Sequence, residues 1–118
     1  MSEYSQERLE RKLSEAIGEL IITGQIKNPH LSPFTSVTRV ELSPDNSLAK
    51  VYVSSMPDNR IDPSVKALNS ASGFIQGRVG KVLKTKNTPV LTFFRDDSYR
   101  EAERINKLID EAVKDIKE

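Results

Sequence analysis

The stretch 68-LNSASGFIQGRVGKVL-83 combines the spacing of a helix with residues that weaken one. Its apolar residues recur at helical intervals, at Leu68, Ala71, Ile75, Val79, Val82 and Leu83. Yet each glycine inside a helix costs about 1 kcal/mol relative to alanine, and Ser70 and Ser72 are also poor helix formers. The pattern predicts a helix that is interrupted by a kink at Ala71, Ser72 and Gly73.

The glycines of this stretch share one side of the predicted helix. At 100° per residue, Gly73, Gly77 and Gly80 fall opposite the apolar face, together with Lys81 and Lys84, and Arg78 lies at the flank. One interpretation is a bare ridge that lets a phosphodiester backbone approach closely. The other is tight packing of the glycines against a neighbouring helix, with the lysines reaching outward to water.

The distribution of charge favours the anion-binding interpretation. The net charge of the 118 residues is only +1. From Pro63 to Arg95, however, there is no acidic residue, and the six basic residues are Lys66, Arg78, Lys81, Lys84, Lys86 and Arg95. Such an asymmetry indicates an anion-binding surface on a protein that is otherwise balanced for solubility.

Regular elements precede this stretch. Residues 5–23 form an amphipathic helix with an apolar stripe, and Gly24 is the expected helix stop. The alternating segments 36–43 and 48–55 predict two strands. Pro44, Asp45 and Asn46 lie between them and favour a tight turn, so we expect an antiparallel hairpin.

The elements that follow complete one domain. Asp62 is the expected N-cap of the interrupted helix, with Pro63 at its first position. Residues 89–95 predict a third strand, and a capping box at Ser98 begins a last amphipathic helix. The order helix, strand, strand, kinked helix, strand, helix predicts a single α+β domain over residues 1–118, with a three-stranded sheet covered by helices on one face.

The composition excludes several classes. There is no cysteine, which removes disulfides, thiol nucleophiles and cysteine metal sites. No apolar run approaches the roughly 20 residues of a membrane span, and the N-terminal segment does not resemble a signal peptide. We expect a cytoplasmic protein with no membrane partner, no cofactor, no metal and no small-molecule substrate.

The order of elements and the kink resemble a type II KH domain, an RNA-binding fold. More closely, the sequence resembles the ribosome-binding factor A family. The residues that carry the resemblance are VTRVELSPDNSLAKVYVS (37–54), LNSASGFIQGRVGKVL (68–83), TPVLTFFRDDS (88–98) and ERINKLI (103–109). The resemblance covers nearly the whole chain.

This resemblance implies a non-enzymatic, KH-like assembly factor. It implies binding to the small ribosomal subunit and its rRNA, a role late in subunit maturation and rRNA processing, and a link to growth in the cold; we expect a monomer. The family replaces the Gly-x-x-Gly loop of KH domains with an Ala-x-Gly kink, here Ala71-Ser72-Gly73, so recognition of structured RNA is at least as well supported as clamping of a single strand. The chain departs from the family at Asn28-Pro29-His30, where an Asp-Pro-Arg-like segment is usual, and at Gln76, where many members carry Arg.

We therefore assign RNA binding to Arg78, Lys81, Lys84, Lys86, Arg95 and Gly77. Other candidates have simpler structural explanations. His30 has no obvious partners for catalysis or metal binding, and the Asp96–Asp97 pair favours the start of a helix. Phe74, or the outward-facing member of the Phe93–Phe94 pair, could stack on a base. Two alternatives stay open: a protein-interaction module that uses the glycine ridge, and a small enzyme of ferredoxin-like shape.

Overall fold

The computed structural model describes residues 5–56, 58–84 and 87–97. The described elements are α1 (Gln6–Ile22), β1 (Thr35–Leu42), β2 (Leu48–Ser55), a 3₁₀ turn (Asp58–Arg60), α2 (Ile61–Ser70), α3 (Ser72–Leu83) and β3 (Val90–Arg95). This order confirms the predicted α+β class up to the third strand. The predicted last helix, its capping box at Ser98, and Lys86 lie outside the described residues.

The three strands form one mixed sheet in the order β1-β2-β3. β1 and β2 pair antiparallel, which confirms the predicted hairpin, whereas β2 and β3 pair parallel. The parallel pairing follows from the connection, because α2 and α3 carry the chain back to the starting edge of the sheet. At the hairpin turn Asn46 adopts a left-handed conformation with φ 62°, as asparagine tolerates well.

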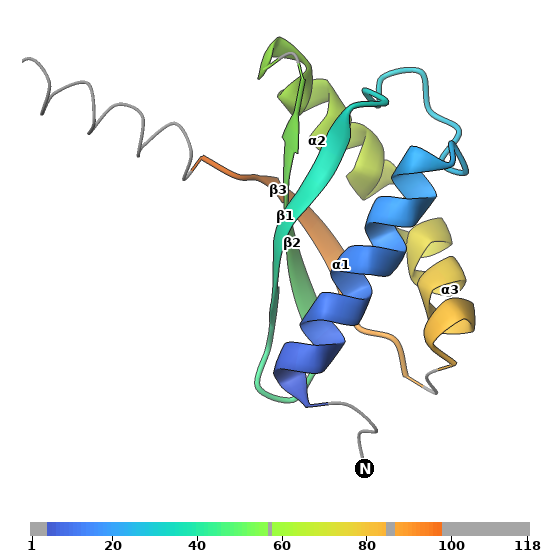
Figure 1. Ribbon diagram of the computed structural model, residues 1–118, viewed down its shortest axis with the longest axis vertical. Helices are drawn as coiled ribbons and strands as arrows, with labels where there is room; N and C mark the ends of the chain where they lie inside the picture. The colour runs from blue at the N-terminus through green and yellow to red at the C-terminus, as the bar shows by residue number, and fades with distance from the viewer. Residues whose placement is uncertain (1–4, 57, 85–86, 98–118) are drawn as a thin grey trace, which may run out of the picture.

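Helices cover one face of this sheet. Figure 1 shows α1 and α3 side by side along that face, with α2 above α3. In β2, Ala49, Val51 and Val53 are buried and alternate with more exposed residues, as expected for a sheet with one covered face. The core consists of these side chains, Phe93 of β3, and the apolar stripes of α1 and α3, which include Leu13, Ile17, Ile75 and Val79.

Two local predictions need correction. Helical spacing groups Val82 with the core residues, but Val82 is 62% exposed. The buried face of α3 is centred on Val79, and Val82 lies about 60° around the helix from it. Asp62 is not the N-cap, because the 3₁₀ turn runs directly into α2 and leaves Arg60 in the cap position. The predicted stop after α1 is confirmed, since Gly24 is left-handed with φ 71°.

Candidate nucleic-acid interface

The break between α2 and α3 lies at Ala71, where the sequence predicts it. Ala71 has φ −98° and ψ 10° and serves as the last cap of α2 and the first cap of α3. Its N–H donates to the carbonyls of Ala67 and Leu68, and its own carbonyl accepts from the N–H of Ile75. Ala71 offers no side-chain cap, so the first turn of α3 begins without a side-chain acceptor for its N–H groups. The two helices are thus joined by a single residue.

Asn69 attaches this kink to the sheet. Its Nδ2 donates to the carbonyl oxygen of Phe93 at 3.0 Å, and its Oδ1 accepts from the N–H of Phe93 at 2.8 Å. These backbone groups belong to β3, one of the two edge strands of the sheet, so Asn69 takes the place of a missing neighbouring strand. Asn69 lies in the last turn of α2, so these two hydrogen bonds fix the start of α3 relative to the sheet. Sequence reasoning missed this role, although a poor helix former just before the break was a usable signal.

The outward side of α3 carries the predicted cations. We call the exposed residues Gly73, Gly77, Arg78, Lys81 and Lys84 the α3 face. Lys84 ends the helix in a left-handed conformation with φ 56°. The ion pairs found in the described part of the chain involve Arg39 and Arg95, and none of them involves a cation of the α3 face. As far as the structure describes the chain, the charges of Arg78, Lys81 and Lys84 have no carboxylate partner and can meet an external anion.

The space around the glycines separates the two interpretations of the ridge. A Cβ placed on Gly73 or Gly77 would have nothing within 4 Å, so neither glycine is required for packing against a described residue. Gly80 is different, since a Cβ there would lie 2.5 Å from Oγ1 of Thr88. Among the described residues, packing therefore explains only Gly80 of these three glycines. Its neighbour Thr88 lies in a loop and not in a helix.

Arg95 lies apart from the α3 face. It is the last residue of β3, roughly 16–17 Å along the strand from Val90, the first residue of β3. Its guanidinium is 2.9 Å from a carboxylate oxygen of Asp62 and 2.9 Å from one of Asp97. Desolvation alone would lower the pKa of Arg95, but hydrogen bonding to Asp97 and the charge of Asp62 outweigh it and raise the pKa. The structure thus pairs Arg95 with two carboxylates instead of grouping it with Lys81 and Lys84.

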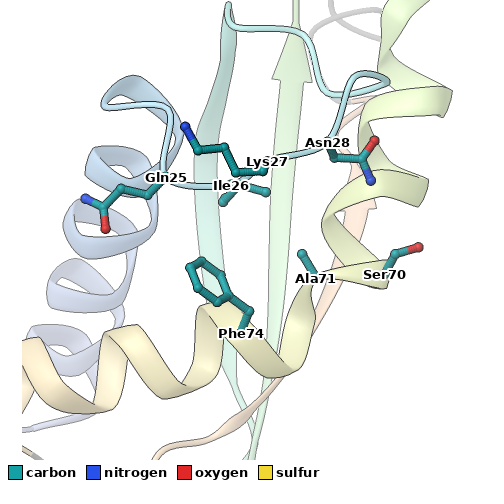
Figure 2. Close-up of a pocket in the computed structure, with 7 residues that line it drawn as sticks. All are labelled: Gln25, Ile26, Lys27, Asn28, Ser70, Ala71 and Phe74. Carbon is teal, nitrogen blue, oxygen red and sulfur yellow. The ribbon is translucent and has the colours of Figure 1, made fainter.

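A hollow of about 340 Å³ opens beside the kink (Figure 2). One wall is the loop after α1, and the other is the junction of α2 and α3. The lining residues are Gln25, Ile26, Lys27, Asn28, Ser70, Ala71 and Phe74. Phe74 is 44% exposed, and the guanidinium of Arg78 lies 5.3 Å from the centre of its ring. The hollow thus adjoins the α3 face.

The remaining candidate residues lie in ordinary structural settings. His30 is exposed, and its backbone N–H donates to Oδ1 of Asn28. Asp97 accepts from Arg95, and Asp96 accepts a hydrogen bond from Thr38. No three His, Asp or Glu side chains gather as metal ligands would among the residues that the structure describes.

The two adjacent phenylalanines of β3 face opposite sides of the sheet. Phe93 is buried, whereas Phe94 is 39% exposed on the uncovered face. There the ring of Phe94 lies against that of Tyr52, with 5.7 Å between ring centres.

No described helix combines the length and hydrophobicity that a membrane crossing requires.

Comparison with known proteins identifies the protein family of this chain. A model of the ribosome-binding factor A family matches residues 5–109. The ribosome-binding factor A of Borreliella burgdorferi is 42% identical over 104 residues, which cover 87% of each chain. The chain belongs to the ribosome-binding factor A family. The family that the sequence resemblance indicated is therefore confirmed.

Solved structures of the ribosome-binding factor A family share the fold. The crystal structure of ribosome-binding factor A from Thermus thermophilus matches with a TM-score of 0.68 and 25% identity, covering 77% of this chain and 94% of that one. A second similar structure is a homology model of the T. thermophilus protein fitted into the cryo-EM map of a 30S–RbfA complex. It has a TM-score of 0.63 and 26% identity, and covers 76% of this chain and 93% of that one.

Two residues noted as departures from the ribosome-binding factor A family lie at the site. Gln76, on α3, donates from Nε2 to the carbonyl of Thr88 at 2.9 Å and so holds the loop that packs on Gly80. Asn28 lines the hollow beside the kink. Gln76 therefore binds the loop before β3 and is not one of the residues of the α3 face.

Proposed function

We propose that this chain binds the small ribosomal subunit through its rRNA and promotes a late step of rRNA processing and subunit maturation. It acts by occupying its site, without catalysis or a cofactor, as a monomer in the cytoplasm. The observation that carries the proposal is the α3 face, where three cations without carboxylate partners in the described chain stand beside two open glycines. Membership of the family and the 30S complex of the T. thermophilus relative support the same target.

The α3 face suits a phosphodiester backbone for two reasons. Gly73 and Gly77 leave the helix backbone uncovered, so a phosphate can approach more closely than side chains would permit. Arg78, Lys81 and Lys84 surround this bare strip and can neutralise phosphates, which releases counterions and favours binding. Asn69 and the kink at Ala71 hold α3 at a set angle to the sheet, so the cations are positioned before RNA arrives.

Charge reversal on the α3 face tests the proposal. Lys81→Glu combined with Lys84→Glu should abolish co-sedimentation of the full chain with purified small subunits. Both side chains are exposed and unpaired in the described chain, so the melting temperature should change little. Arg11→Glu combined with Lys12→Glu is the matched control, because these residues are adjacent, exposed and equally charged on α1.

The control variant should co-sediment as the unaltered chain does. Undiminished co-sedimentation of the Lys81/Lys84 variant would show that the α3 face is not the contact. Equal loss in both double variants would show that binding depends on overall charge and not on this face.

A further inference from the structure

We propose that the hollow beside the kink holds the base of a single unpaired nucleotide in the bound RNA. This inference rests on the proposed function and specifies the kind of RNA that the α3 face meets. Four features of the hollow support it: its aromatic wall, its polar rim, its size and its continuity with the α3 face.

The aromatic wall is Phe74. Its ring is 44% exposed although it lies next to a concave surface, and Arg78 stands over it with its guanidinium 5.3 Å from the ring centre. An unstacked base can lie on a phenylalanine ring or on the plane of an arginine guanidinium, and both are present here. Stacking would also remove the exposed ring from water.

The rim supplies groups that suit a nucleotide. Gln25 and Asn28 carry amides, which can both donate to and accept from the edge of a base. Lys27 also lines the hollow, and its ammonium group can attract the phosphate of a nucleotide that enters. No carboxylate is among the residues that line the hollow, so nothing there repels a phosphate. Buried Ile26 and half-buried Ala71 provide an apolar floor.

The size of the hollow limits what can enter. About 340 Å³ is near the lower end of the range for small-molecule sites, so one nucleotide is of a suitable size and a base pair is not. Phe74, Arg78 and Gly77 lie within about one turn of α3. An RNA strand that follows the α3 face therefore reaches the hollow within one or two nucleotides, and a base that leaves its helix there meets Phe74.

Photo-crosslinking on purified small subunits tests the inference. The full chain with p-benzoylphenylalanine in place of Phe74 should crosslink to one rRNA nucleotide that has no Watson–Crick partner. The same photoreactive group in place of Val82 is the matched control, since Val82 is exposed on the same side of α3, two turns away. The control should not crosslink to that nucleotide.

Affinity for the same subunits provides a second measurement. Phe74→Leu should weaken binding about tenfold, because stacking on an aromatic ring strengthens binding by roughly fivefold to a hundredfold per base. Phe74→Tyr should bind as the unaltered chain does. Because Phe74 is partly exposed and outside the core, both variants should fold.

The outcomes separate this inference from the proposed function. Crosslinks from position 74 only to paired nucleotides or to a ribosomal protein would overturn the inference, and so would full affinity of Phe74→Leu. Either result leaves the dependence on Lys81 and Lys84 untouched. If the unaltered chain itself did not co-sediment with small subunits, the proposed function would fail first.

Discussion

Replacing Gly77 by glutamine should make the protein more stable and a weaker binder at the same time. Gly77 lies inside α3, and a Cβ there meets nothing within 4 Å, so glutamine fits without strain. A glycine inside a helix costs close to 1 kcal/mol relative to alanine, and glutamine costs only part of that. Gly77→Gln should therefore raise the free energy of unfolding by about 0.5 kcal/mol. That corresponds to about 2–4 °C in the melting temperature of a domain of this size.

Binding should change in the opposite direction. The glutamine side chain would stand on the bare strip where a phosphate is proposed to approach. The phosphate would then lie farther from Lys81 and Arg78, and Coulomb attraction falls with distance. We expect affinity for small subunits to fall about tenfold, a loss of roughly 1.4 kcal/mol of binding free energy. Because glutamine is uncharged, the change tests close approach and leaves the charge of the α3 face unaltered.

Gly18→Gln is the matched control. Gly18 lies inside α1, away from the α3 face, and a Cβ there also meets nothing within 4 Å. This variant should gain similar stability and keep full affinity. The assays are thermal unfolding followed by circular dichroism, and titration of labelled protein with purified subunits. Equal affinity of the two variants would refute the claim that a phosphate approaches the helix backbone closely at Gly77.

Three further outcomes are expected. With three cations on the α3 face, the logarithm of the binding constant should fall against the logarithm of salt with a slope of about −2 to −3; a slope near zero would instead favour a protein partner. Asn69→Ala should destabilise the fold by about 1–3 kcal/mol in urea unfolding, because two backbone groups of Phe93 lose their partners; a smaller loss would contradict its anchoring role. Hydrogen bonds from Ser47 and Ser43 lower the pKa of Asp45 from 3.8 to about 2. Because the folded pKa lies below the unfolded one, this stabilisation is complete above about pH 4 and is lost as the pH falls towards 2; an NMR titration midpoint near 3.8 would contradict it.

Features that depend on nearby residues could be predicted from the sequence. The apolar stripe of α1, the hairpin and its turn, the helix stop at Gly24 and the break at Ala71 follow from local periodicity and local backbone preferences. The cations of α3 were also predictable, because residues on one helix face are related by a fixed rotation. The absence of acids from Pro63 to Arg95 indicated the same segment.

Only the tertiary structure could separate Arg95 from Lys81 and Lys84. All three belong to one acid-free segment, yet Arg95 meets Asp62, which is 33 positions away, because α2 packs beside β3. In the same way, the hollow unites residues 25–28 with residues 70–74, and Asn69 meets Phe93 across 24 positions. Helical periodicity relates residues along one element, but the pairing of distant side chains depends on how the elements pack. For that reason the sequence located the charged helix, whereas the fold determined which charges remain available and what lies beside them.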